Sequence, residues 1–310
     1  MSTSSTTGRC FLKKQRPFFW KINLMIQVNQ LRFRSVFLLG IFQIAAIICP
    51  AQKLKPEDVV ARHLESIGTT EARAGISSRV AQGSADVTKR IGGSGHAVGG
   101  AVMASQGRMS LIGIIFAPQD YSNEKVAFDG TKLTLGELTP GNRTRLGIFF
   151  KEHDIMFKEG LIGGTLSAAW PLLDLSVKNP KLKYVGVKKI SGRSLHVLEY
   201  EPRSGGNLDI RLYFDSETFQ HIRTEYDQSF TAPTVTNPDK AARQKETHLK
   251  FIEEFSNFKV ESGLNLPHSY KMQLTIDSEG NPLLQDWLIN LSQFVFNKNL
   301  DAKQFDVNAK

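Results

Sequence analysis

The residues that could support catalysis are few and scattered along the chain. The seven histidines show neither an H-x-H nor an H-E-x-x-H spacing, the kind of spacing that brings two imidazoles to one metal ion. The two cysteines, Cys10 and Cys49, both lie near the N-terminus. We therefore expect no catalytic residue, no metal site and no cofactor.

Two short stretches group polar residues or glycines closely enough to be considered as binding sites. EHD at 152–154 places three ligand types in a row, but we expect an exposed polar patch there. GGSGHAVGG at 92–100 contains neither G-x-S-x-G nor a phosphate-loop spacing. Its glycines predict a bent hairpin, and a flexible loop at which a ligand enters is the alternative.

Two carboxylate pairs complete the search for acid-base chemistry. They are Glu199 with Glu201 and Glu253 with Glu254. Acid-base catalysis needs one member of a pair to be buried with a raised pKa, and nothing in the sequence indicates this. The pairs predict solvated strands. The protein is accordingly predicted not to be an enzyme, and a secreted hydrolase is the least favoured alternative.

The excess of positive charge belongs to the N-terminus. The net charge is +9, but the first 51 residues carry seven Lys and Arg and no Asp or Glu. The rest of the chain is nearly balanced, with 32 basic and 30 acidic residues. This balance removes the electrostatic basis for binding a phosphate backbone, so we expect no nucleic-acid partner.

The N-terminus has the layout of a targeting segment. Arg32 and Arg34 precede the apolar run VFLLGIFQIAAII at 36–48. Cys49 and Ala51 then occupy the −3 and −1 positions of a small-x-small cleavage site. We predict a signal peptide over residues 1–51, cleavage after Ala51, and a periplasmic or secreted product.

Three alternatives to this processing stay open. The apolar run could be an uncleaved anchor, although it is shorter than the ~20 residues of a spanning helix. Met25 could be the true start, which would give a signal of ordinary length. Acylation of Cys49 would make an outer-membrane lipoprotein, but Ile48 precedes the cysteine where such signals have a small residue.

The chain after residue 51 opens with one helix and continues with strands. In KPEDVVARHLESIG at 55–68, Pro56 suits the first helical turn and Gly68 the end. Beyond it the apolar period changes to two, and runs rich in β-branched and aromatic residues are mostly separated by hairpin-length turns. The predicted strands are 79–91, 95–104, 108–117, 124–129, 131–138, 182–190, 194–201, 207–215, 219–228, 246–260, 268–276 and 284–297. They predict a mainly antiparallel meander.

Two segments interrupt the meander. The first, at about 140–180, predicts a short helix from Thr165 to Trp170 that Pro171 halts, with a helical turn at 151–158. The second, at about 231–244, is polar and contains prolines, and it predicts an exposed loop.

One hairpin shows the alternation of faces that the strands should have. Leu212 and Phe214 project to one face of the strand at 207–215. In the returning strand, Ile222 and Tyr226 are predicted on one face and His221 on the other. One face of the hairpin is therefore apolar and the other polar.

The second half of the chain contains a series of turn and strand motifs. They are YVG at 184–186, the SGR turn at 191–193, YFDSET at 213–218, GLNLPHSY at 263–270 and an Asp301 to Phe305 ending. In these motifs the chain resembles the bacterial outer-membrane lipoprotein-sorting carriers, the periplasmic lipoprotein-localisation factor family. The resemblance implies a mainly β (α+β) fold: an unclosed antiparallel β half-barrel of about 11 strands, covered by an N-terminal helix and a short helical insert. Residues 52–310 would form this single domain.

The resemblance also implies a function without catalysis. The apolar concave face would bind acyl chains, lipids or lipoproteins in the periplasm, and peripheral contact with a membrane is a further option. The alternatives are a core that is fully packed and an envelope interaction or sensing module that docks a protein partner. The candidate cavity residues are Ile114, Phe116, Phe149, Leu161, Trp170, Leu212, Phe214, Ile222, Leu274 and Trp287.

Overall fold

The computed structural model describes most of the chain after the predicted targeting segment. The described residues are 54–117, 122–136, 143–230, 247–278 and 282–309. The predicted signal peptide with its cleavage site, the alternative start at Met25 and the predicted loop at 231–244 lie outside them. No helix in these ranges is long and apolar enough to cross a membrane.

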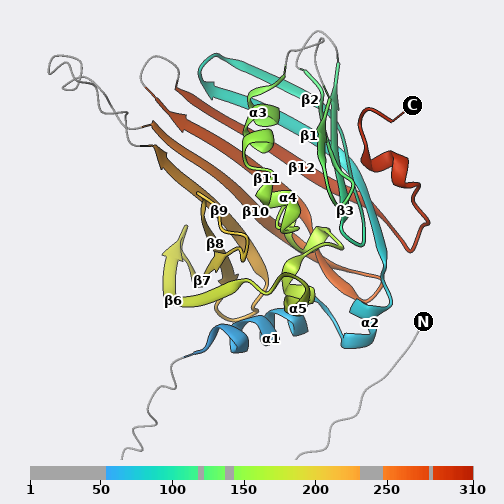
Figure 1. Cartoon of the computed structure of the whole chain (residues 1–310), viewed down its shortest axis with the longest axis vertical. Helices are drawn as coiled ribbons and strands as arrows, with labels where there is room; N and C mark the ends of the chain where they lie inside the picture. Colours follow the sequence, from blue (N-terminus) through green and yellow to red (C-terminus); the bar gives the residue numbers. More distant parts are fainter. Residues whose placement is uncertain (1–53, 118–121, 137–142, 231–246, 279–281, 310) are drawn as a thin grey trace, which may run out of the picture. The chain divides into compact units, whose positions relative to one another are not determined.

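Twelve strands form one curved antiparallel sheet (Figure 1). They are β1 (Ser78–Ile91), β2 (Gly95–Gln106), β3 (Met109–Phe116), β4 (Glu124–Phe128), β5 (Leu133–Leu135), β6 (Lys181–Ile190), β7 (Arg193–Glu201), β8 (Asp209–Asp215), β9 (His221–Phe230), β10 (Thr247–Glu261), β11 (Leu264–Asp277) and β12 (Leu283–Phe296). Their order is β5-β4-β3-β2-β1-β12-β11-β10-β9-β8-β7-β6, with β5 and β6 at the two edges. The predicted open, mainly β fold is confirmed, with twelve strands where about 11 were expected.

The strand order explains why a long connection lies over the sheet. The first strand, β1, lies in the middle of the sheet, and the following strands are added outward until β5 forms one edge. It resumes at β6 on the opposite edge and steps back until β12 pairs with β1. The connection from β5 to β6 must therefore travel from one edge to the other, and it does so across the concave face (Figure 1).

This connection, which we call the insert (residues 143–180), is built from short helical pieces. They are α3 (Arg145–Glu152), α4 (Ile155–Lys158), the 3-10 turns η1 (Gly164–Leu166) and η2 (Pro171–Leu173), and α5 (Leu175–Lys178). The predicted helix from Thr165 to Trp170 is wrong. Gly163 and Gly164 have φ values of 79° and 49° and allow only one 3-10 turn, while Pro171 begins η2 instead of halting a helix.

The predicted N-terminal helix is confirmed as α1 (Pro56–Ile67), and the short α2 (Thr70–Ala74) follows it. The buried residues of α1 are Val59, Val60, His63 and Ile67. The helix ends at Gly68, where a Cβ atom would lie 2.5 Å from the carbonyl oxygen of Gly263. A residue without a side chain is thus needed where α1 meets the β10–β11 turn.

Both edges of the sheet are protected against pairing with other chains. Edge strand β5 is only three residues long, and the segment after η3 (Ala302–Phe305) reaches it through a bond from the Val307 main-chain N–H to Thr134 Oγ1, 3.0 Å. Edge strand β6 carries exposed lysines that pair with β7, Lys181 with Glu201 and Lys183 with Glu199. Short length and charge are common means of keeping an edge unpaired.

A bulge in β9 changes which face two of its residues occupy. Tyr213 pairs with Arg223, but the next residue of β8, Phe214, pairs with His221, so Ile222 is an extra residue. His221 consequently lies in the main core, fully buried. The predicted position of Ile222 on the inner face is wrong, because Ile222 packs in a small separate cluster on the opposite face.

The bulge can be tested by comparing two truncations in the β8–β9 hairpin. Leu212→Ala removes a fully buried inner-face side chain and should lower the unfolding free energy by about 2–5 kcal/mol. Ile222→Ala removes a half-buried side chain and should cost about 1 kcal/mol or less. Urea denaturation of both variants measures the difference, and equal losses would contradict the assigned bulge.

Candidate apolar binding site

The insert is joined to the sheet by a buried arginine. Arg79 on β1 is 3% exposed, and its Nη1 donates to the main-chain carbonyl oxygens of Thr165 and Ser167. Burial lowers the pKa of Arg79 to about 10, so the guanidinium keeps its charge at neutral pH. A buried charge that loses its partners is costly. These bonds therefore hold residues 165–167 against the sheet.

A buried carboxylate holds the same loop from another strand. Glu253 on β10 accepts hydrogen bonds from the Gly163 main-chain N–H at 2.7 Å, from the Tyr226 hydroxyl at 2.7 Å and from the Tyr270 hydroxyl at 2.6 Å. Burial raises its pKa to about 7, against the opposing effect of these three donors. Gly164 then passes so close to His221 that a Cβ atom would lie 2.7 Å from the imidazole Nδ1.

An aromatic and imidazole cluster joins α1, the insert and β9. Trp170 Nε1 donates to His63 Nε2 at 3.0 Å, which requires His63 Nδ1 to carry the proton that it donates to the Phe219 carbonyl oxygen at 3.0 Å. The Trp170 ring stacks on His221, with 4.6 Å between ring centroids. Burial lowers the pKa of His63 to about 4 and that of His221 well below its usual value. Both imidazoles are neutral at pH 7 and act as packing and hydrogen-bonding groups.

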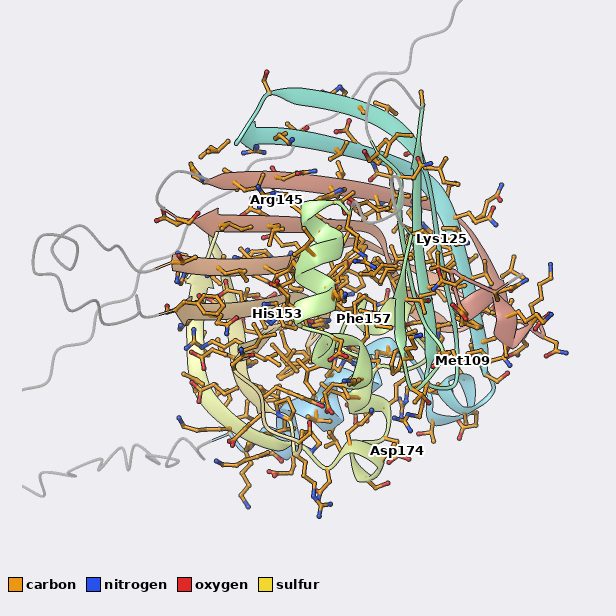
Figure 2. The ribbon with its side chains drawn as sticks, turned by 45° about the horizontal axis from the view of Figure 1, so that its top comes forward. Met109, Lys125, Arg145, His153, Phe157 and Asp174 are labelled. Atoms are coloured by element: carbon orange, nitrogen blue, oxygen red, sulfur yellow. The ribbon has the colours of Figure 1, made fainter. Side chains whose placement is uncertain are left out.

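A pocket lies beside Trp170, between the insert and the β2–β3 turn. Its volume is about 200 Å³. The turn contributes Gly107 and Arg108, and the insert contributes everything else. The apolar side chains that line it are Phe157, Ala168, Ala169, Trp170, Pro171, Leu173 and Val177. Figure 2 shows how the insert runs from Arg145 past His153 and Phe157 to Asp174, which is itself a lining residue. The pocket suits an apolar ligand.

The candidate cavity residues are mostly packed against one another. Nine of the ten belong to the main core and are at most 4% exposed. They are Ile114, Phe116, Phe149, Leu161, Trp170, Leu212, Phe214, Leu274 and Trp287. Of these nine, Trp170 also lines the pocket, and Ile222 lies on the other face. In this conformation the insert fills the space that an acyl chain would occupy on the concave face.

Two expectations about polar residues are wrong. His153 of the EHD stretch is 3% exposed instead of lying in an exposed patch, and its ring packs against Phe149. Glu253 is fully buried instead of solvated. The alternation of β10 places Phe251, Glu253 and Phe255 on the inner face. This alternation could have predicted that Glu253 is buried, but a glutamate is normally expected to be exposed.

The glycine-rich stretch at 92–100 has the predicted structural role. Gly92 and Gly93 adopt φ values of 79° and 131° in the β1–β2 turn. Gly99 lies where a Cβ atom would come within 2.0 Å of the Ile115 carbonyl oxygen. The glycines allow the turn and the close approach of β2 to β3.

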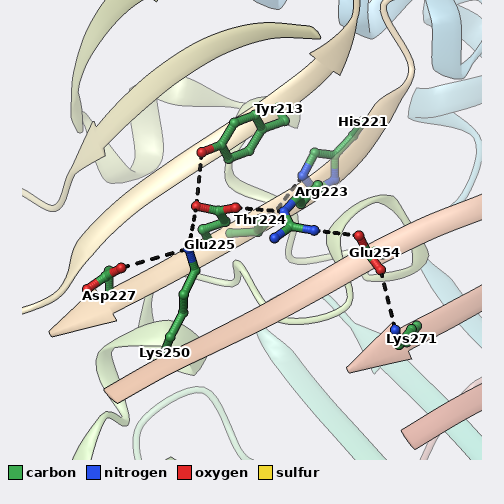
Figure 3. A network of polar contacts seen from close by, with 9 residues as sticks. All are labelled: Tyr213, His221, Arg223, Thr224, Glu225, Asp227, Lys250, Glu254 and Lys271. Atoms are coloured by element: carbon green, nitrogen blue, oxygen red, sulfur yellow. Dashed lines mark hydrogen bonds and ion pairs between the residues drawn. The ribbon is translucent and has the colours of Figure 1, made fainter. Parts of the chain in front are cut away.

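The outer face of β8 to β11 carries a polar network. Figure 3 shows Glu225 between the Tyr213 hydroxyl, Arg223 and Lys250. Arg223 also forms an ion pair with Glu254. The Glu225 carboxylate accepts from the Tyr213 hydroxyl at 3.0 Å and lies 2.8 Å from Arg223 Nε. Tyr213 and Glu225 are only 1% and 7% exposed, so the centre of this network is buried within the outer face. No group of three or more metal-ligating side chains occurs among the described residues.

A different surface occurs on the outer face of β2 and β3. Val98 is 59% exposed and Ile115 is 63% exposed. They flank a shallow hollow of about 550 Å³ to which Gly83, Gly100 and Gly113 contribute, with Ile115 as part of its lining. The glycines leave the surface beside these two exposed apolar side chains without large side chains, and the rest of the lining includes the polar residues Gln82, Ser292 and Gln293.

Comparison with known proteins identifies similar structures but no similar sequences. No protein-family model matches the chain, and no curated protein matches it. A LolA superfamily protein from Nitrosomonas europaea is 11% identical, with 81% of this chain and 97% of that chain covered and a TM-score of 0.46. A DUF1329 family protein from Desulfovibrio piger is 9% identical, with 82% and 98% covered and a TM-score of 0.39.

A third similar structure is a putative outer membrane lipoprotein-sorting protein domain from Vibrio parahaemolyticus. It is 11% identical, with 81% of this chain and 97% of that chain covered and a TM-score of 0.37. All three of these similarities have TM-scores below 0.5 and sequence identities of at most 11%.

Glu253 should make stability depend on pH. Its folded pKa of about 7 lies above the ordinary 4.5 of the unfolded chain, so the folded protein binds this proton more tightly. The resulting stabilisation is complete below pH 4.5 and is lost as the pH rises to 7. Glu253→Gln removes the titration, so wild-type stability relative to this variant should fall by about 3 kcal/mol over that range.

Urea unfolding at several pH values measures this difference. Glu254→Gln is the matched control, because Glu254 lies on the outer face and pairs with Arg223 and Lys271. A wild-type minus Glu253→Gln difference that stays constant between pH 4.5 and 7 would show that Glu253 does not titrate there.

Proposed function

We propose that this protein is a non-catalytic binding or carrier protein of the cell envelope that holds an acyl chain. The observation that carries the proposal is the apolar pocket of about 200 Å³ between the insert and the β2–β3 turn, with Trp170 in its wall. The ligand would be a lipid or an acylated protein. Export through the predicted signal peptide, with the periplasm as the working compartment, is part of the same proposal.

The size of the pocket limits what it holds. Pockets for drug-sized molecules have volumes of roughly 300–1,000 Å³, so about 200 Å³ accommodates part of one chain. Each buried methylene contributes about 0.8 kcal/mol, and a few methylenes suffice for weak, reversible binding. Reversibility suits a protein that has to release its ligand.

A longer chain would need part of the concave face, which the insert covers. The polar groups that join residues 163–167 to the sheet are Arg79 and Glu253. We propose that movement of the insert away from these two side chains extends the pocket toward the packed core residues. Loading and release would then follow the position of the insert.

A second candidate function has its own observation. The apolar outer surface at Val98 and Ile115 would suit a protein partner of the envelope, as in an interaction or sensing module. A partner that purifies with the protein in the absence of lipid, and that is lost on Ile115→Ser, would favour this function. A secreted hydrolase has no comparable observation in its favour.

Native mass spectrometry of the protein purified from a bacterial periplasm without detergent tests the main proposal. We expect an added mass that matches an acylated species, recovered by organic extraction at near-stoichiometric amounts. A clean mass without ligand, unchanged after lipids are offered, would contradict it.

Filling the pocket should abolish the added mass. Ala169 is a half-buried lining residue, and Ala169→Phe adds a ring to the space that the chain would occupy. We expect acyl-chain affinity to fall at least about tenfold, equivalent to about 1.4 kcal/mol. Val260→Phe adds the same ring at a position that is 72% exposed and should leave binding unchanged. Equal binding by both variants would place the ligand elsewhere.

A further inference from the structure

The mouth of the pocket carries an exposed guanidinium. Arg108 follows Gly107 in the β2–β3 turn and is exposed. Within the described part of the chain it has no hydrogen-bond or ion-pair partner. A cation without a partner beside an apolar pocket is free to bind an anion that comes with an apolar ligand.

A second cation, Lys178, lines the same pocket. Lys178 lies at the end of α5, is half-buried, and donates from Nζ to the Lys158 carbonyl oxygen. Burial lowers the pKa of Lys178, and the charge of Arg108 lowers it further while Glu159 opposes the change. The two cations are therefore close enough to repel each other, and an anion between them would relieve the repulsion.

The acidic groups near the mouth already have partners of their own. Asp154 pairs with Lys158 at 2.7 Å. Asp174 accepts from the main-chain N–H of Ser176 at 3.0 Å and from its hydroxyl. Glu159 accepts from the Tyr200 hydroxyl at 2.7 Å. In the lining, the charge of Lys158 is thus offset by Asp154, and Lys178 lies near Glu159 as well as Arg108. Arg108 is the lining cation that has no ion-pair or hydrogen-bond partner among the described residues.

From this combination we infer that the pocket selects a single-chain amphiphile with an anionic head group, a carboxylate or a phosphate monoester. The acyl chain lies against Phe157, Trp170 and Leu173, and Arg108 and Lys178 bind the head group. The volume of about 200 Å³ excludes a second chain in this conformation. This inference rests on the proposed function, because it names the ligand class of the same pocket.

Titration calorimetry with matched ten-carbon amphiphiles tests the head-group preference. The probes are decanoate, decanol, decyltrimethylammonium and inorganic phosphate, each added to the intact protein near neutral pH. We expect decanoate to bind about tenfold more tightly than decanol, because two partly screened charges contribute. Decyltrimethylammonium should bind more weakly than decanol, and inorganic phosphate should not displace decanoate because it lacks the chain.

Two variants assign the preference to the two side chains. Arg108→Gln with Lys178→Gln should lower decanoate affinity about tenfold and leave decanol affinity within about twofold of wild type. Arg108→Gln alone changes an exposed residue that makes no hydrogen bond or ion pair within the described part of the chain, so it keeps the fold, and it should lower decanoate affinity about threefold. Arg203→Gln, an exposed arginine outside the pocket lining, should change nothing.

The outcomes separate the inference from the proposal on which it rests. Equal affinity for decanoate and decanol, unaffected by the double variant, would overturn the head-group inference and leave acyl-chain binding standing. Displacement of decanoate by inorganic phosphate would overturn it in favour of a free-anion site. Binding of neither decanoate nor decanol would overturn the acyl-chain proposal itself.

Discussion

The structure depends on one topological constraint: the chain has to connect the two edge strands of an open sheet. Strands β5 and β6 lie eleven places apart in the strand order, so the residues between them have to cross a face. The face they cross is the apolar one, which would otherwise be left to water. The same segment therefore completes the core, covers the concave face and forms most of the pocket wall.

The way the insert is attached also matters for function. Apolar side chains such as Phe149, Phe157 and Trp170 supply the packing, while Arg79 and Glu253 bind the backbone of residues 163–167. Buried charges contribute little net stability but make the loss of a partner costly. Arg79 and Glu253 therefore determine where the insert docks more than they increase the stability of the docked state. The proposed movement of the insert would have to break this apolar packing as well as the bonds to Arg79 and Glu253.

The pocket and the packed core differ in how accessible they are to a ligand. On the proposed function, a ligand would contact the wall formed by Trp170 and the residues around it. Trp170 also belongs to the packed core, whose other members include Leu212, Leu274 and Trp287. The outer face of the sheet carries the polar network on β8 to β11 and the exposed apolar side chains Val98 and Ile115 on β2 and β3, so its surface differs from one part to another.

Sequence alone was sufficient for the strands and for α1, but not for the short helical pieces of the insert. Period-two alternation and turn residues placed all twelve strands, and Pro56 and Gly68 bounded α1, because these signals act between neighbouring residues. The resemblance to the lipoprotein-sorting carriers then predicted that the sheet is open. Tertiary structure decided the rest: the bulge that turns Ile222 outward, the burial of Glu253 and the pocket beside Trp170. The pocket and the partners of Glu253 depend on contacts between residues far apart in the chain, such as the Glu253 bond to Gly163, which no local pattern encodes. The bulge depends on the pairing of β8 with β9, in which Phe214 pairs with His221 and leaves Ile222 as an extra residue.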